Sequence, residues 1–398
     1  MKIAKLTFLV LACINLACVN PSVNSKNINF NTSFINAEKQ MSLLLKDAEQ
    51  ANRIPRTLNE HGHMHWTNTD FDWTEGFFPG SCWFLYEQTK NRKWKNAAEK
   101  FQLKFESHKT LTTNHDLGFV FNCSYGKGYE LTKNEHFKEI LITAANSLLT
   151  RFNPTVGCIK SWDVNTGWQA ERGWKYPVII DNMMNLELLF KVSEFTGNNK
   201  YKQAAITHAN TTLNNHFRND NSSVHVVDYD PVTGEVRGKY TAQGFANESS
   251  WARGQAWGLY GYTVCYRFTK DTTYLHQAEK IAQYILNFNG TPDDGIPYWD
   301  YHAPKIPNEP RDVSAASITA SALLELNKYS KNNYLPAINK IMASLGTKEY
   351  TASIGKNKHF ILKHSVGSIP HGNEIDVPLN YADYYYLEAL SRYKSIEQ

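Results

Sequence analysis

The sequence predicts an all-α protein whose helices form an (α/α)6 toroid, a ring of six helical hairpins in a single domain. One short joint recurs five times along the chain, and about twelve segments with helical periodicity surround its copies. Helices joined in tight pairs suit a closed toroid, and an open helical solenoid is the alternative. At 398 residues the chain is long for an ordinary domain, but a closed ring of helices reaches this size as one unit.

The repeated joint ends one helix and begins the next. Each copy places an Asn or Asp where a new helix starts, and these residues are preferred N-caps because their side chains accept a free backbone N–H. An aromatic residue follows and is expected to pack on the first turn. The copies are Thr89–Trp94, Thr132–Phe137, Thr196–Tyr201, Thr269–Tyr274 and the shorter Ser330–Tyr334.

The helices follow in order along the chain, and in a toroid the first helix of each joint is inner and the second is outer. Inner segments such as Gly254–Gly258 and Ser314–Ser317 are rich in small residues, which allow close packing around the axis. The predicted spans are 35–52, 76–89, 91–107, 116–131, 133–152, 179–196, 198–219, 248–269, 271–289, 313–330, 332–348 and 379–394.

Three long connections interrupt the helical pattern at residues 153–178, 220–247 and 290–312. The second contains alternating valines followed by a Pro–Gly turn signal, which predicts a β-hairpin. Each connection leads into an inner helix, so all three are expected at the same end of the toroid. Long loops in a compact domain are often functional.

The N-terminus is typical of an export signal. Lys2 and Lys5 precede an apolar run over 6–14, which is too short to span a bilayer. Residues 15–18 resemble a bacterial lipoprotein cleavage box with Cys18 as the lipidated residue, and plain cleavage near 18–24 is the alternative. We therefore predict a signal peptide over 1–17, a polar tether over 18–34 and the helical domain over 35–396. The protein is expected in the periplasm or at the cell surface, with a lipid on Cys18 as its only membrane contact.

Composition excludes several classes of function. Apolar residues make up 42% and charged residues 20%, so the chain is neither disordered nor fibrous. The net charge of +4 gives no electrostatic case for nucleic acid. The four cysteines beyond the signal region lack Cys-x-x-Cys spacing, so we expect no metal and no cofactor, and Cys82, Cys123 and Cys265 are interpreted as small buried residues. An aromatic content of 13% is compatible with a sugar-binding site.

Polar and aromatic residues gather where the inner helices begin. In a toroid these clusters ring one mouth, where carboxylates can move protons, Trp faces can stack on sugars, and Arg or His can bind acidic groups. The arrangement predicts a carbohydrate-cleaving site. The clusters are residues 72–77, 114–119, 179–185, 248–257, 311–312 and 371–374.

Two aspartates are the candidate catalytic groups. Asp181 follows an apolar run, 178–180, which disfavours its ionisation and suits a proton donor. A helix cap is the alternative for Asp181 and for Asp116, although two such residues on alternate inner helices favour catalysis. Asp312 is a third candidate for which capping is favoured. His225 is also open to two interpretations, as a site residue or as an exposed strand residue.

At these clusters the sequence resembles glycoside hydrolase family 88, the unsaturated glucuronyl hydrolases, from about residue 35 to 394. The family has a six-hairpin (α/α)6 fold. The resemblance implies that Asp181 is the general acid/base and Asp116 its essential partner. It also implies a set of substrate-binding residues: His115, Trp73, Trp162, His225, Gln243, Arg253 and Trp257. The motifs are Trp73–Phe77, His115–Phe119, Asp181–Asn185, Trp251–Trp257 and His371–Gly372.

The implied reaction removes the terminal 4,5-unsaturated glucuronic acid from anionic oligosaccharides that polysaccharide lyases release. Asp181 would protonate C4 of the vinyl ether, water would add at C5, and the hemiketal would open without a metal. The polymer is predicted to be ulvan or a glycosaminoglycan, and the Asn-, Lys- and Tyr-rich composition slightly favours ulvan. The alternatives are an unsaturated rhamnogalacturonyl hydrolase acting on pectin fragments, a His-based sugar epimerase, and a non-catalytic surface glycan-binding lipoprotein.

Overall fold

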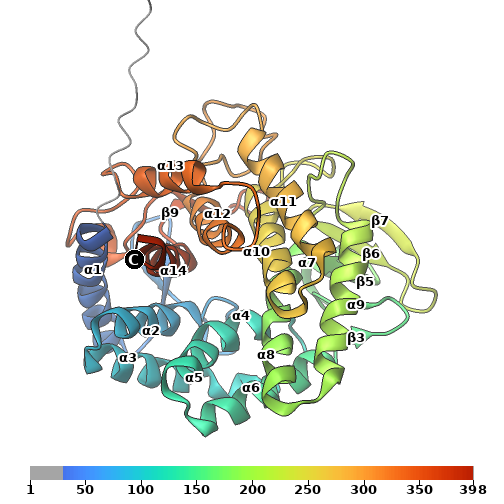
Figure 1. Cartoon of the computed structure of the whole chain (residues 1–398), viewed down its shortest axis with the longest axis horizontal. Coiled ribbons are helices and arrows are strands. Elements are labelled where there is room, and N and C mark those ends of the chain that lie inside the picture. The colour runs from blue at the N-terminus through green and yellow to red at the C-terminus, as the bar shows by residue number, and fades with distance from the viewer. Residues whose placement is uncertain (1–29, 398) are drawn as a thin grey trace, which may run out of the picture.

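The chain folds into a double ring of helices (Figure 1), as the joints predicted. The structure is a computed structural model that describes residues 30–397, so the predicted signal peptide and Cys18 lie outside the described residues. Consecutive inner helices pack side by side around the axis, and each has an outer partner. The inner ring contains α2 (Phe77–Thr89), α4 (Leu117–Phe121), α8 (Leu186–Thr196), α10 (Ala252–Thr269), α12 (Val313–Leu326) and α14 (Asn380–Glu397). The outer ring contains α1 (Phe30–Ala51), α3 (Arg92–Gln102), α6 (Glu135–Leu149), α9 (Asn199–Asn215), α11 (Thr272–Asn287) and α13 (Leu335–Leu345).

The predicted capping at the joints is confirmed. In four joints the Asn or Asp side chain accepts the N–H of the residue two positions later, and the fifth joint does the same through Asn333 and Leu335. The aromatic residue of every copy is buried, which anchors each outer helix to the core. The four capping residues are Asn91, Asn134, Asn198 and Asp271. The five aromatics are Trp94, Phe137, Tyr201, Tyr274 and Tyr334.

Helix boundaries differ from the prediction where backbone geometry changes. The span 116–131 is split into α4, a π-helical turn over Asn122–Gly126 and α5 (Lys127–Thr132). The helix expected from residue 179 is preceded by a strand, β5 (Tyr176–Ile179), and a 3-10 turn over Ile180–Asn185. Pairing with a second strand takes priority over helical propensity there. At the N-terminus, α1 begins inside the segment that was predicted to be a tether.

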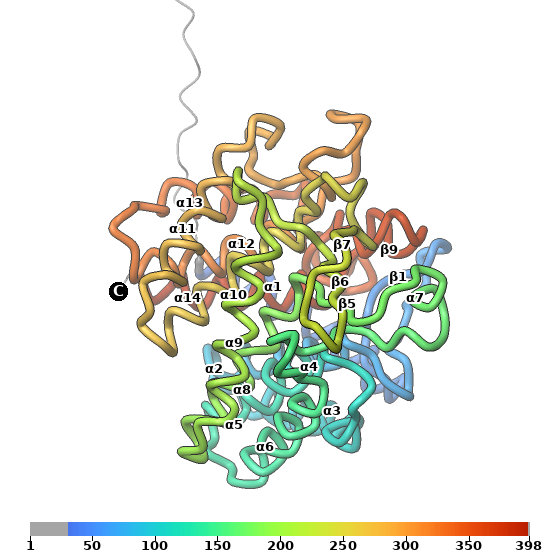
Figure 2. The backbone as a smooth tube through the Cα atoms, turned by 90° about the vertical axis from the view of Figure 1, so that its right-hand side faces the viewer, coloured from blue at the N-terminus to red at the C-terminus, as the bar shows by residue number. Residues whose placement is uncertain are grey.

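Short strands lie at one end of the ring. The predicted hairpin is present as β6 (Val226–Tyr229) and β7 (Val236–Tyr240), and β5 joins it in a three-stranded antiparallel sheet. Figure 2 shows this sheet, α7 (Gly167–Glu171), β1 and β9 on the side away from the C-terminal end of α14. The two-stranded pairs are β1 (Pro55–Leu58) with β2 (Met64–Trp66), β3 (Phe152–Asn153) with β4 (Cys158–Ile159), and β8 (Ser365–Ser368) with β9 (Asn373–Val377).

The core is continuous through both rings. Cys82, Cys123 and Cys265 are buried free thiols within it, as predicted, and Cys158 is also buried and free. Neighbouring inner elements approach so closely that some positions accept only glycine: a Cβ on Gly118 would lie 2.3 Å from Asn185 Cα. Within residues 30–397 no helix is long and apolar enough to cross a membrane.

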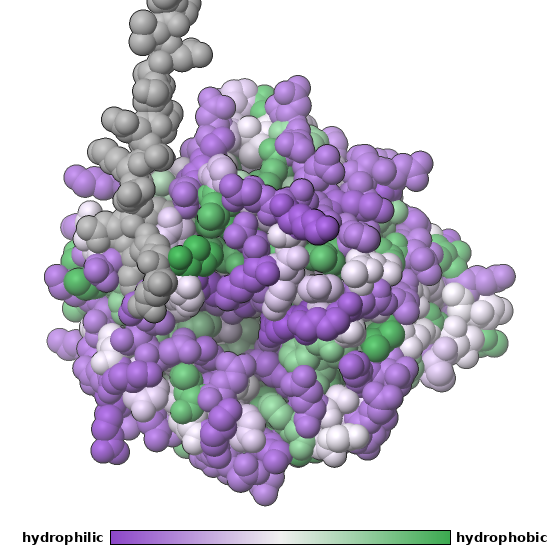
Figure 3. Space-filling view, viewed as in Figure 1, coloured by the Kyte–Doolittle hydropathy of each residue, from purple (hydrophilic) through white to green (hydrophobic). Residues whose placement is uncertain are grey.

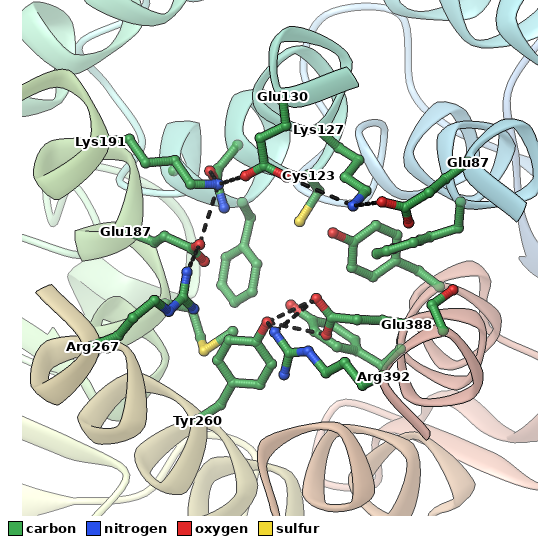
Figure 4. Close-up of a pocket in the computed structure, with 18 of the residues that line it drawn as sticks. Glu87, Cys123, Lys127, Glu130, Glu187, Lys191, Tyr260, Arg267, Glu388 and Arg392 are labelled. Atoms are coloured by element: carbon green, nitrogen blue, oxygen red, sulfur yellow. Dashed lines mark hydrogen bonds and ion pairs between the residues drawn. The ribbon is translucent and has the colours of Figure 1, made fainter. Parts of the chain in front are cut away.

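The end of the ring opposite the strands is closed by charged side chains. They surround a cavity of about 250 Å³ (Figure 4). Lys191 pairs with Glu130 at 2.7 Å and with Glu187 at 3.2 Å, and Arg267 pairs with Glu187 at 2.7 Å. The face seen in Figure 3, on which this end of the ring opens, is mostly hydrophilic.

This network links all six hairpins. Lys127 of α5 binds Glu87 of α2 at 3.0 Å, and Arg267 of α10 binds Glu325 of α12 at 2.6 Å. The connection continues from Glu325 to Arg392 of α14 at 3.1 Å. Removing one partner of a buried pair leaves an uncompensated charge, so these ion pairs favour the closed ring over open arrangements of the same helices.

We expect Lys191→Met to lower the free energy of unfolding by about 2 kcal/mol, because it removes the cation shared by the buried Glu187 and the exposed Glu130. Urea unfolding would measure the loss. Lys138→Met is the matched control, since the pair of Lys138 with Glu135 is on the surface and exposed pairs contribute less than about 1 kcal/mol. Equal stability of Lys191→Met and wild type would show that the network does not hold the ring together.

Candidate active site

The two predicted aspartates lie next to each other in the ring at the strand-bearing end. Asp116 directly precedes α4, and Asp181 lies in the 3-10 turn between β5 and α8. Neither carboxylate caps its helix through a side-chain hydrogen bond, so the capping interpretation is not what the structure shows. Both are more than nine-tenths buried, and Oδ2 of Asp181 has no hydrogen-bond partner in the described part of the chain. An unpartnered buried carboxylate oxygen is available to a substrate.

A neutral histidine faces Asp181. Nδ1 of His225 accepts two backbone N–H groups, from Ala242 at 3.0 Å and from Gln243 at 3.1 Å. The ring proton is therefore on Nε2, which lies 3.7 Å from Asp181 Oδ2. Burial, together with the charge of Arg253, lowers the pKa of His225 well below its usual value. His225 is 4% exposed, so the interpretation as an exposed strand residue is wrong.

A second histidine faces Asp116 in the same way. Nδ1 of His115 accepts from the Asn185 amide at 3.3 Å, which leaves the proton on Nε2, 3.4 Å from Asp116 Oδ1. Burial and, to a smaller extent, the charge of Arg151 lower the pKa of His115 to about 3. Each aspartate therefore faces an uncharged imidazole N–H rather than a cation.

Burial also controls the protonation of the aspartates. It raises the pKa of Asp116 to about 8, and the charge of Asp181 adds to the shift. Burial raises the pKa of Asp181 to about 7 against the opposing charge of Arg253. Because the two carboxylates repel each other, the pair retains a proton at neutral pH. The site can therefore donate a proton and accept one, which is the requirement for general acid/base chemistry.

Arg253 is a structural anchor of the site. Its buried guanidinium pairs with Asp312 at 3.1 Å and donates to the carbonyls of Val366 and Gly367 in β8. Asp312 caps α12 by accepting the N–H of Ser314 at 3.0 Å, which confirms its interpretation as a helix cap. Arg253 Nε has no hydrogen-bond partner within residues 30–397. Most donors of the predicted substrate-binding arginine are therefore used to hold the β8–β9 hairpin over the mouth.

A cavity of about 400 Å³ opens beside Arg253, and neither Asp116 nor Asp181 is among the residues that line it. Four of the predicted binding residues line it: Trp73, Trp162, Gln243 and Arg253. An isolated antiparallel β-bridge between Asn114 and Trp162 joins the loop of Asp116 to the cavity wall. The structure thus brings the predicted helix-start clusters together at one mouth.

Trp257 occupies a different place from its predicted neighbours. Its side chain is fully buried and packs against Phe119 and Tyr385, with ring centres 5.0 and 5.2 Å apart. Trp251 is likewise buried, behind His225, at 4.7 Å between ring centres. Neither ring is among the residues that line the cavity. The structure gives both residues packing positions below the site.

Residues 48–398 match the model of Glycosyl Hydrolase Family 88. The chain belongs to this family. It is an enzyme of the unsaturated glucuronyl hydrolase type, as the motif resemblance predicted.

Other members of family 88 are similar over nearly the whole chain. An unsaturated glucuronyl hydrolase of Formosa agariphila is 40% identical over 98% of this chain and 99% of its own length. An unsaturated chondroitin disaccharide hydrolase of Streptococcus agalactiae is 35% identical over 85% of each chain. A solved unsaturated glucuronyl hydrolase specific for heparin superposes with a TM-score of 0.87 at 43% identity, covering 92% of this chain and 97% of that one.

Several residues of this family 88 site were not predicted from the sequence. Asn185 donates a hydrogen bond to His115 and accepts the N–H of Phe119 at 2.9 Å. The sequence feature that could have indicated Asn185 is its position four residues after Asp181. Arg56 joins Asp72 and Glu374 at 2.8 and 2.6 Å, linking segments that are far apart in sequence. No local pattern marks such a contact. Within residues 30–397 no group of three or more His, Cys, Asp or Glu side chains is arranged to hold a metal.

The raised pKa values predict a pH-dependent stability. The folded state holds protons that the unfolded chain releases, so this contribution is complete below the unfolded carboxyl value near 4 and is lost as pH rises through about 7 to 8. The double variant Asp116→Asn/Asp181→Asn should therefore be more stable than wild type at pH 9, by a few kcal/mol, and much less so at pH 5.

Urea midpoints at the two pH values would measure this difference. Asp230→Asn is the control, because hydrogen bonds from Lys175 and the backbone lower the pKa of Asp230 and ionisation there costs the fold nothing. A double variant no more stable than wild type at pH 9 would contradict the burial argument.

Proposed function

We propose that this chain removes the terminal 4,5-unsaturated glucuronic acid from oligosaccharides left by polysaccharide lyases. The observation that carries the proposal is the buried pair Asp116 and Asp181, which keeps a proton at neutral pH and faces two uncharged imidazoles. The names of the family 88 relatives support the same activity.

The chemistry starts with proton transfer to carbon. Asp116 and Asp181 share one proton at neutral pH. When this proton is on Asp181, that residue donates it to C4 of the C4=C5 double bond, and positive charge develops at C5 and the ring oxygen. Asp116, as the carboxylate, stabilises that charge. Asp181, now ionised, accepts a proton from the water that adds at C5. The hemiketal opens and releases the next sugar, so the bond to that sugar breaks without direct attack at the anomeric carbon, unlike ordinary glycoside hydrolysis.

The imidazoles support this sequence by remaining neutral. A cationic His225 beside Asp181 would stabilise the carboxylate and weaken the proton donor. As N–H donors, His225 and His115 can bind hydroxyl groups of the uronate without that penalty. Among the described residues their Nε2 atoms have no hydrogen-bond partner, and neither has Asp181 Oδ2. Substrate hydroxyls would satisfy all three atoms.

Asp181→Asn tests the assignment. We expect the variant to lose at least a thousandfold in the rate at which the absorbance of the unsaturated uronate decays, because an amide cannot donate this proton. Substrate binding should remain measurable by calorimetry. Asp230→Asn is the matched control, since Asp230 lies in the β6–β7 turn, and it should retain full activity. Normal turnover by Asp181→Asn would exclude Asp181 as the acid.

We propose glycosaminoglycan fragments as the substrate. The printed names of similar proteins support this choice, since they specify chondroitin disaccharide and heparin. The preference for ulvan rests on composition alone and stays a prediction.

A panel of lyase-generated disaccharides separates the two polymers. We expect faster decay of the double-bond absorbance with unsaturated chondroitin or heparin disaccharides than with unsaturated glucuronyl-rhamnose 3-sulfate from ulvan. A higher kcat/KM on the ulvan product would reverse the assignment.

The other functional hypotheses have less support. Membership of family 88 favours glucuronyl over rhamnogalacturonyl substrates. A His-based epimerase needs a histidine that exchanges protons near neutral pH, whereas the pKa values of His115 and His225 are strongly lowered. A purely glycan-binding protein has no need of two buried carboxylates with raised pKa values, which cost stability.

We also propose that the chain is exported and carries lipid on Cys18. The support is the N-terminal sequence: two lysines, an apolar run and a cysteine after a short box. Expression in a bacterial host with labelled palmitate should give labelled protein in the membrane fraction. Cys18→Ser should lose the label and leave that fraction. Unlabelled wild-type protein would favour plain cleavage.

A further inference from the structure

An aromatic wall borders the mouth of the cavity. Trp168 of α7 lines the cavity and packs against Trp162 at 5.0 Å and Trp174 at 5.9 Å between ring centres. On its other side it meets His371, which follows β8, at 5.0 Å. Figure 2 shows α7 and β9 at the same end of the molecule. The α7 segment and the β8–β9 hairpin thus meet above the site, although about two hundred residues separate them along the chain.

The two arginines that line the cavity are already neutralised. Arg253 pairs with Asp312, and Arg56 pairs with both Asp72 and Glu374. A substrate anion at either guanidinium would have to compete with a buried carboxylate. The lining therefore offers little free positive charge to an acidic oligosaccharide.

Arg172, one residue beyond α7, differs from both. Its guanidinium carbon lies 5.9 Å from the ring centre of Trp168 and 5.6 Å from that of Trp174. The residue is exposed, and within residues 30–397 its side chain forms no ion pair and no hydrogen bond. Its charge nevertheless acts at the mouth of the cavity: burial lowers the pKa of His371, and the charge of Arg172 contributes to the same shift.

This combination leaves the guanidinium oriented and its donors free. Stacking on indole rings restrains an arginine through the ring faces and uses none of its five N–H groups. Those groups match the oxygens of a sulfate or a carboxylate, which an arginine binds in a bidentate manner. A restrained, unpaired arginine beside an aromatic wall is thus suited to an acidic sugar that stacks on the wall.

We propose that Arg172 binds an acidic substituent on a sugar beyond the terminal unsaturated uronate, while Trp168 supports that sugar. The inference rests on the proposed function and specifies its substrate as an oligosaccharide that is anionic beyond its first residue. A sulfate ester on the second sugar and a uronate carboxylate on the third share this chemistry, and the experiment separates them.

The test compares wild type with Arg172→Gln on three unsaturated glycosaminoglycan products. These are an unsulfated disaccharide, the sulfated disaccharide, and an unsulfated tetrasaccharide that contains a second uronate. We expect Arg172→Gln to raise KM about three- to tenfold for the sulfated disaccharide, the tetrasaccharide or both, with kcat unchanged. KM for the unsulfated disaccharide should stay within twofold of wild type, and Arg172→Lys should recover part of the loss. The substrate that responds identifies the anion.

Arg92→Gln is the matched control. Arg92 is an exposed arginine at the start of α3 in the outer ring, and its loss should alter no KM. Raising NaCl from 50 to 500 mM should shrink the difference between wild type and Arg172→Gln, because salt screens an exposed charge pair. A merely structural role of Arg172 would not produce this salt dependence.

Three outcomes would overturn the inference. The first is an unchanged KM for both anionic products in Arg172→Gln. The second is an equal rise for all three substrates, which would place Arg172 on the terminal uronate or in folding. The third is a KM effect that does not respond to salt. If wild type consumed none of the three products, the proposed function itself would fail, and this result is distinct from the other three.

Discussion

The close approach of neighbouring inner helices is the constraint on which the rest of the structure depends. Gly118 packs on the backbone of Asn185, and a Cβ on Gly76 would lie 2.3 Å from the carbonyl oxygen of Val120. At these contacts backbone meets backbone, so the turns that begin adjacent helices lie at one level of the ring. Asp116 is two residues before Gly118, and Asp181 is four before Asn185. The packing that closes the ring therefore also brings the two carboxylates together and removes them from water.

Burial of the two aspartates and the two histidines makes the chemistry possible and also lowers the stability of the fold. Loss of water raises the pKa of both aspartates and lowers that of both histidines, so proton donor, carboxylate and neutral hydrogen-bond donors coexist at one pH. Such a site destabilises the fold wherever a buried carboxylate must ionise. The charges at the opposite end of the ring are less buried and are paired, as between Glu187 and Arg267. Acidic side chains that are paired with cations help to close the ring at one end. Acidic side chains that lack such an ion pair serve catalysis at the other end.

The mouth is built differently from the ring. Asp116, Asp181 and Arg253 lie at or near the starts of inner helices, whereas the connections between helices supply most of the cavity wall, including Trp168 and the β8–β9 hairpin. Arg253 and Arg56 attach that hairpin to the ring through buried ion pairs. The reacting groups thus sit where the inner helices begin, and the groups proposed to meet the outer part of the substrate sit on connections between helices, which tolerate variation.

The sequence by itself determined the double ring, because each joint repeats a local signal: a cap that satisfies a free N–H and an aromatic that anchors the next helix. It also indicated Asp116, Asp181 and His115 through motifs at helix starts, and His225 through the family resemblance. It did not reveal the strand β5, the burial of Trp257 or the ion pair of Arg253 with Asp312. Those features depend on which segments meet across the ring, and Arg56 meets Glu374 across 318 residues. Local propensity has a range of a few residues, whereas burial and pairing are set by contacts that exist only after the ring has closed.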